Sequence, residues 1–132
     1  MTLDELIAAL PEEPSWNAVV LKLDEAGGIV PISIFEIDAD EDERQIKLVT
    51  DEFADRQRPH EEAFDLAGFA GALRSLSDGC GDYTLFSASD YVEHGEYEGR
   101  LCLPIVGVVS NPDAGAFALL PEPREQWRSI FG

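Results

Sequence analysis

Alternating apolar and polar positions over residues 16–50 predict three consecutive β-strands. The first two are WNAVVLKL (16–23) and GIVPISIFEID (28–38), and the third is RQIKLVT (44–50). The Gly27-Gly28 pair between the first two tolerates the positive φ angles of a tight hairpin turn. We therefore expect an antiparallel meander in the first half of the chain.

The second half contains three further β-rich runs, DYTLFSAS (82–89), YEGRLCLPIVGVV (97–109) and GAFALLP (115–121). Between the last two, Asn111-Pro112-Asp113 is followed closely by Gly115, a combination typical of tight turns. This predicts a hairpin that joins the last two strands.

Helical patterns occur at both ends and in the middle of the chain. Thr2 and Glu5 form a capping box at the start of an apolar stripe, and residues 65–76 continue a helical pattern from the capping residue Asp65. We expect Gly68 and Gly71 on that middle helix to allow close approach to a sheet. A third helix is expected within residues 123–132.

These elements predict one globular domain over residues 1–132 of the α+β class, with a mainly antiparallel sheet of five or six strands and two or three helices packed on it. No internal repeat of fixed period is apparent. The chain lacks an apolar stretch of the length that crosses a bilayer and an export signal, which predicts a cytoplasmic protein.

The net charge of the chain limits the classes of partner that we expect it to bind. The 27 acidic and 9 basic residues give a formal net charge of −18, and 18 of the acids lie in the first 65 residues. Such a chain repels phosphate backbones and anionic lipids, so we expect neither ordinary nucleic-acid binding nor membrane binding. A basic protein is the expected kind of partner, although an acidic surface also serves solubility.

The densest acidic stretch, Asp38 to Glu43, contains five acids in six positions between two predicted strands. Asp38, Asp40 and Asp42 match the first three ligand positions of an EF-hand calcium loop. The pattern then fails, because Glu43 occupies the glycine position and Val49 the bidentate glutamate position. We interpret the stretch as a solvated hairpin turn that forms a contact surface, and we predict no metal site and no cofactor.

The chain has two cysteines and two histidines, and their sequence context does not indicate a metal site or a catalytic site. Cys80 and Cys102 match no zinc pattern, and a reducing compartment argues against a disulfide. Cys80 is flanked by Asp78 and Asp82, which would not lower the pKa of a nucleophilic thiol. His94 lies among glutamates that do not share one face of a strand. The sequence therefore predicts no catalytic residue.

Trp16 and Trp127 are the aromatic candidates for a contact surface, because tryptophan often anchors protein interfaces. The alternative is that Trp16 begins a buried strand and that the terminal helix carrying Trp127 packs on its own sheet.

Three functions follow from these observations. The first is a small acidic protein-binding module, of the inhibitor or antidote type, whose contact residues are Asp38, Asp40, Asp42, Glu43, Trp16 and Trp127. The second is a nucleic-acid mimic with carboxylates spaced like phosphates. The third is a small enzyme that uses Cys80 or the region of His94.

Overall fold

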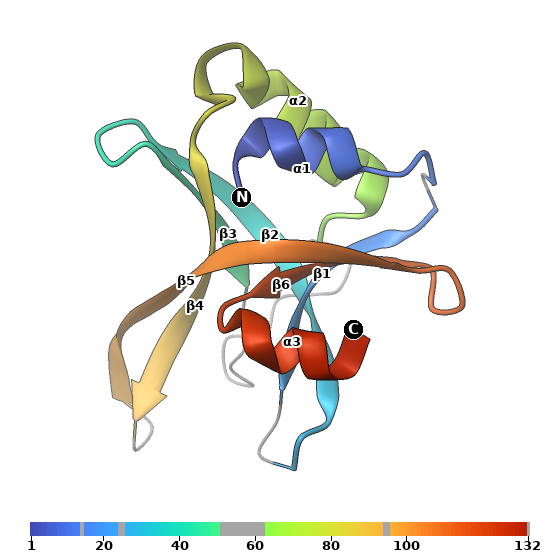
Figure 1. The fold of residues 1–132 in the computed structure, drawn as a ribbon. Helices are drawn as coiled ribbons and strands as arrows, with labels where there is room; N and C mark the ends of the chain where they lie inside the picture. Colours follow the sequence, from blue (N-terminus) through green and yellow to red (C-terminus); the bar gives the residue numbers. More distant parts are fainter. Residues whose placement is uncertain (14, 24–25, 51–62, 94–95, 132) are drawn as a thin grey trace.

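The computed structural model describes residues 1–13, 15–23, 26–50, 63–93 and 96–131, with residues 90–93 and 96–100 described by their strand geometry only. The chain forms three helices and six strands (Figure 1). In order these are α1 (Leu3–Ala9), β1 (Asn17–Leu23), β2 (Ile29–Asp40), β3 (Gln45–Thr50), α2 (Leu66–Cys80), β4 (Thr84–Glu93), β5 (Glu96–Asn111), β6 (Ala116–Pro121) and α3 (Arg124–Phe131). The predicted α+β class is confirmed.

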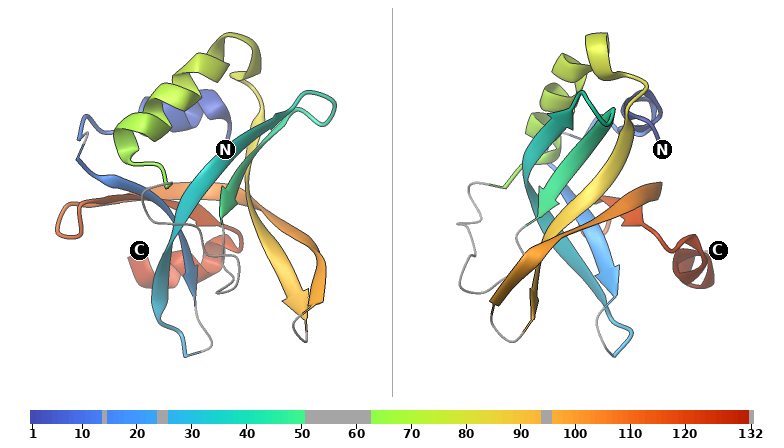
Figure 2. Two further views of the ribbon diagram at one scale, coloured as in Figure 1. Left: turned by 180° about the vertical axis from the view of Figure 1, so that it is seen from behind. Right: turned by 90° about the vertical axis from the view of Figure 1, so that its left-hand side faces the viewer.

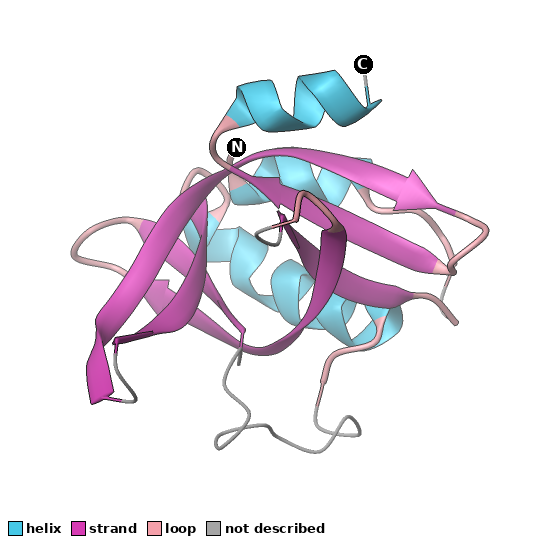
Figure 3. Cartoon of the chain, turned by 90° about the horizontal axis from the view of Figure 1, so that it is seen from below, coloured by secondary structure: helices cyan, strands magenta, loops and turns pink. Residues whose placement is uncertain are grey.

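The six strands close into a barrel in which each strand pairs with its neighbours in chain order (Figures 1 and 3). The β1–β2, β2–β3, β4–β5 and β5–β6 pairs are antiparallel. The first two confirm the predicted meander, and the last confirms the predicted hairpin. The β3–β4 and β1–β6 pairs are parallel and join one meander to the other. The sequence predicted neither the β4–β5 pair nor these two closing pairs.

The two long strands β2 and β5 each change partner near their middle. β2 pairs first with β1 and then with β3, with a register shift between Ile34 and Glu36. β5 pairs first with β4 and then with β6, with a register shift between Ile105 and Gly107. Such irregularities bend a strand and increase its twist, so they let each long strand turn from one side of the barrel to the next.

The same pairing pattern occurs twice, in α1-β1-β2-β3 and in α2-β4-β5-β6. Each helix begins with a hydrogen bond to the other unit: the Leu3 N–H donates to the Tyr83 carbonyl at 3.0 Å, and the Leu66 N–H donates to the Trp16 carbonyl at 2.8 Å. Each acceptor is the aromatic residue that directly precedes the first strand of its unit. The two units therefore hold each other through equivalent contacts.

The third strands are held in the same reciprocal way. Arg44 and Gly115 precede β3 and β6, and both have positive φ angles, of 55° and 60°. The Arg44 carbonyl accepts from the Thr84 N–H at 3.2 Å, and the Gly115 carbonyl accepts from the Asn17 N–H at 2.9 Å. These bonds start the two parallel pairings that close the barrel.

This repetition has no fixed period along the chain. Equivalent residues are 63 apart at the helix starts Leu3 and Leu66, and 71 apart at the third-strand starts Gln45 and Ala116. The second unit has a longer helix and a longer second strand, while the third strands have 6 residues each. This changing offset explains why the sequence pattern did not reveal the repeat.

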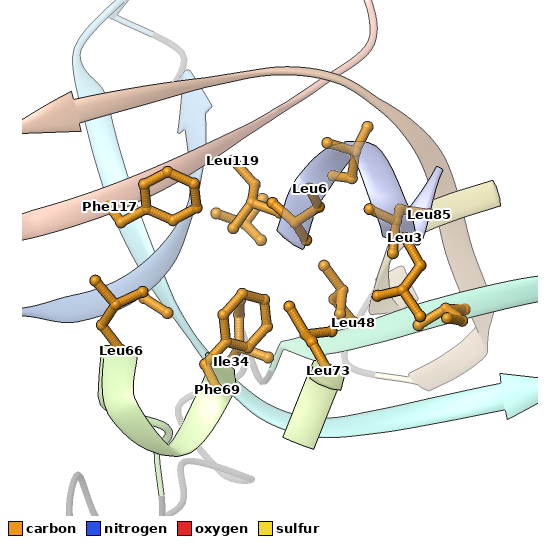
Figure 4. Close-up of a cluster of buried hydrophobic side chains, with 14 of the residues drawn as sticks. Leu3, Leu6, Ile34, Leu48, Leu66, Phe69, Leu73, Leu85, Phe117 and Leu119 are labelled. Atoms are coloured by element: carbon orange, nitrogen blue, oxygen red, sulfur yellow. The ribbon is translucent and has the colours of Figure 1, made fainter. Parts of the chain in front are cut away.

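The main core lies inside the barrel and beneath α1 and α2, which lie side by side over one end (Figures 2 and 4). Ile34 and Ile105, next to the two register shifts, are fully buried in it. Leu6 of α1 and Phe69 of α2 are buried in the same cluster. Both helices therefore contribute to one apolar interior shared by the two units.

A second apolar cluster lies on the outside of the barrel, where α3 packs against β1 and β6. Trp127 is 2% exposed and is surrounded by Val19, Leu21, Ala118 and Leu120. Its indole N–H donates to the Pro121 carbonyl at 2.6 Å. The predicted C-terminal helix is confirmed, and this tryptophan holds it on the sheet.

The expected glycine contact between the middle helix and the sheet is wrong. Gly68 and Gly71 lie on the exposed side of α2, while Leu66, Phe69, Ala70 and Leu73 form its buried side. A Cβ added at Gly71 would meet no atom within 4 Å. The larger apolar residues set the orientation of the helix, because their burial contributes more free energy than close backbone approach.

Gly71→Ala is therefore expected to raise the free energy of unfolding by up to about 1 kcal/mol, because alanine has the higher helix propensity and the site is open. Urea unfolding of both proteins measures the change. Gly68→Ala is the matched control, since its Cβ would lie 3.0 Å from Asp65 Oδ1 and should reduce the gain. Destabilisation by Gly71→Ala would contradict this assignment of the exposed side.

Candidate functional site

The acidic residues predicted for a contact surface lie at the tip of the β2–β3 hairpin, which protrudes beside the barrel (Figure 1). Asp38 and Asp40 lie at the end of β2, next to the turn, and Asp42 and Glu43 lie in the turn itself. Asp38, Asp42 and Glu43 are exposed, and Asp40 is half-buried. The predicted hairpin turn is confirmed, and its flanks are strands rather than the helices of an EF-hand.

Asp40 organises this turn. Its Oδ1 accepts hydrogen bonds from the backbone N–H groups of Asp42 and Glu43, each at 3.1 Å. Its Oδ2 lies 4.0 Å from Lys47 Nζ. In the equivalent β5–β6 turn, Asn111 Oδ1 accepts from the Ala114 N–H at 3.2 Å. Both turns thus have a side-chain oxygen acceptor at this position, and the neutral Asn111 fills the role without a negative charge.

Two other chain segments bring carboxylates to the same end of the barrel. The Asp4 N–H in α1 donates to the Gly81 carbonyl at 2.9 Å, and Arg44 of the turn forms an ion pair with Asp82. The Asp4 carboxylate occupies the space that a side chain at position 81 would need. We name the resulting surface the acidic end. It comprises Asp4, Asp38, Asp40, Glu41, Asp42, Glu43 and Asp82.

The two bases at the acidic end have partners within it. Arg44 pairs with Asp82 and lies over the Tyr83 ring, with its Cζ 5.6 Å from the ring centroid, while Lys47 lies near Asp40. Both side chains of the Arg44–Asp82 pair are more than 60% exposed, so water screens their attraction. The seven carboxylates therefore leave a net negative surface.

Cys80 lies beneath this surface at the end of α2. The thiol is half-buried against the main core and contacts the Tyr83 phenol. Burial is the main cause that raises the pKa of Tyr83, and the contact with Cys80 acts in the same direction. These contacts are those of a residue packed within the fold.

Trp16 lies away from the acidic end. It is half-buried at the start of β1 and lies beside Gly115 of the β5–β6 turn, as Tyr83 lies beside Arg44 in the other unit. The two turns project on opposite sides of the barrel (Figure 2). The structure therefore does not bring Trp16 together with the acidic residues.

Trp127 is removed from the candidate contact residues. Its burial against β1 and β6 is the arrangement expected when the terminal helix packs on its own sheet. The physical reason is the size of the indole, whose large apolar area is covered by Val19, Leu21, Ala118 and Leu120.

A groove that the sequence did not reveal lies on the outer face of the barrel beside α3. It has a volume of about 1000 Å³ and an apolar floor from β1 and β6. Ile29 of β2 and Phe131 of α3 line it and are 43% and 45% exposed. The sequence shows Ile29 and Phe131 as apolar residues. Only the packing of α3 shows that β2 and α3, which are distant in the chain, border one groove.

The two histidines of the chain, His60 and His94, lie outside the described residues, so the predicted alternative of an enzyme site near His94 falls there too. Within the described part of the chain, no three His, Cys, Asp or Glu side chains are grouped so as to hold a metal ion. None of the described helices has the length and apolar character needed to span a bilayer.

Comparison with protein-family models, curated proteins and solved structures found no match to this chain.

The turn geometry makes a specific prediction for Asp40. Asp40→Asn keeps the Oδ1 acceptor and should leave the free energy of unfolding within about 0.5 kcal/mol of wild type, as Asn111 suggests for the equivalent turn. Asp40→Ala removes the acceptor from two N–H groups and should cost about 1 kcal/mol.

Asp42→Ala serves as the control in the same denaturant series, because it removes one acid but keeps the backbone donor. Equal effects of Asp40→Ala and Asp42→Ala would show that charge, rather than the side-chain acceptor, governs the turn.

Proposed function

We propose that this chain is a small protein-binding module of the inhibitor or antidote type, and that its acidic end contacts a basic protein. One observation carries the proposal. The β2–β3 turn, the start of α1 and the connection after α2 are far apart in the sequence, and their carboxylates form one exposed surface. A contiguous surface of one sign is suited to a partner surface of the opposite sign.

Long-range attraction is the physical basis of this function. With a net charge of −18, the whole chain attracts a cationic partner, and the acidic end gives the encounter a preferred direction. Charges at the rim of an interface act mainly on the rate of association. The proposed partner is therefore captured rapidly at low salt and more slowly as the Debye length falls to about 8 Å.

Two alternatives have weaker support. A nucleic-acid mimic needs carboxylates in rows that match phosphate spacing, whereas the acidic end gathers them at one turn and two helix ends. An enzyme based on Cys80 needs an accessible thiol beside a base, whereas the thiol is half-buried and contacts a phenol. The basic-protein partner accounts best for the charge and its placement.

The test is affinity capture of cytosolic proteins on the immobilised chain, followed by association kinetics for each captured protein. A variant with Asp38, Asp40 and Asp42 changed to Asn and Glu43 changed to Gln should associate at least about tenfold more slowly at low salt. Its dissociation rate should change little.

The matched control changes four exposed acids elsewhere, Glu12, Glu13, Glu122 and Glu125, to Gln. Both variants have the same formal charge, so only the position of the lost carboxylates differs. Equal slowing in both variants would leave net charge as the cause and contradict a specific acidic contact surface. Wild-type association rates in both would assign the acidic residues to solubility alone.

A further inference from the structure

The groove beside α3 is a second surface, separate from the acidic end. It is lined by the nearly buried residues Val19 and Leu21 of β1 and Ala118 of β6, and by the exposed residues Pro31 of β2 and Phe131 of α3. The volume of about 1000 Å³ lies at the upper limit of the range for small-molecule pockets. The groove is therefore large enough for several side chains of a partner.

The floor of the groove is continuous with the surface on which α3 packs. Val19, Leu21 and Ala118 line the groove and also belong to the cluster around Trp127. This face of the barrel thus already binds one amphipathic helix through an aromatic side chain. Beside α3, the groove lies between Phe131 and the first half of β2.

The dimensions of the groove match a second short helix. The lining residues of β1 run from Asn17 to Leu21, which spans about 13 Å at a rise of about 3.3 Å per residue. A helix covers that length with about nine residues at 1.5 Å each. The helix α3, which packs on the same face, has 8 residues. A second helix of similar length would lie next to α3 and cover the exposed ring of Phe131.

The charge around the groove indicates the sign of its occupant. Asp65 is the only charged residue among the described residues that line it, and Asp113 belongs to the β5–β6 turn, whose residues Asn111 and Ala114 line the same end. The chain as a whole carries a net charge of −18. A helix with Lys or Arg beside its apolar side complements these charges, whereas an acidic helix would be repelled.

We infer that the groove between α3 and the first half of β2 binds a short basic amphipathic helix of a partner protein, with its apolar side on the exposed lining residues Ile29, Pro31 and Phe131. The inference concerns a surface on the opposite side of the barrel from the β2–β3 turn. It stands independently of the proposed role of the acidic end, and its test uses different variants.

The probe is a fluorescein-labelled helical peptide of about twelve residues, with Leu and one Phe at helical spacing on one side and Lys on the other. Its affinity for the full chain is measured by fluorescence anisotropy. A peptide with Glu in place of each Lys tests the sign of the charge. The Lys peptide should bind, and the Glu peptide should bind at least about tenfold more weakly.

Ile29→Ser combined with Phe131→Ser tests the location of binding and should weaken binding of the Lys peptide by about tenfold, because interface side chains of this kind dominate affinity. Val30→Ser combined with Leu101→Ser is the matched control. These two residues have similar exposure, 38% and 49%, but do not line the groove. The control should bind within about twofold of wild type.

A second measurement removes any dependence on the folding of the variants. In the isotope-labelled wild-type chain, the Lys peptide should shift the amide resonances of Val19, Leu21, Ser33 and Ala118 more than those of the acidic end. Absence of Lys-peptide binding, equal weakening in both double variants, or shifts confined to the acidic end would overturn the inference. A wild-type dimer that Ile29→Ser and Phe131→Ser dissociate would also overturn it, by assigning the groove to a second copy of the chain.

Discussion

The reciprocal hydrogen bonds at the two turns are the constraint on which the rest of the structure depends. A β-meander of three strands has two unpaired edges, and each unit of this chain satisfies its edges with the other unit. The Arg44 and Gly115 carbonyls, both presented by residues with positive φ, accept from the first strand of the opposite unit. They fix the register of the parallel pairs, and the barrel, its interior and its outer surfaces follow from that register.

The two units differ where they face solvent, and this difference produces the two candidate surfaces. Both third-strand turns need a side-chain oxygen at their first position, provided by Asp40 in one and Asn111 in the other. The first turn is otherwise acidic and belongs to the acidic end, whereas the second borders the apolar groove. A fold that is stabilised by its interior and its backbone pairing leaves these turns free to differ, because exposed substitutions have little effect on stability.

Much of the local structure was predictable from the sequence. Strand alternation, the capping box at Thr2 and the turn at Asn111 each depend on residues close together in the chain, and all three appear in the structure. The acidic part of the candidate site was predictable for the same reason, since five acids lie within six consecutive positions of one hairpin. The local pattern did not determine the role of Trp127 or the buried side of α2. A helix has several apolar positions, and the elements packed against it decide which of them are buried.

By itself, the sequence determined the α+β class, the order of helices and strands, the hairpins and the strongly negative charge. The tertiary structure decided that the two meanders close into one barrel, that Asp4 and Asp82 join the hairpin acids, and that Ile29 and Phe131 border one groove. The reason is that these outcomes depend on parallel pairing and packing between residues 38 or more positions apart. Such contacts leave no periodic signal in the chain, since each partner needs only a backbone N–H, a carbonyl or an apolar surface that many other residues also provide.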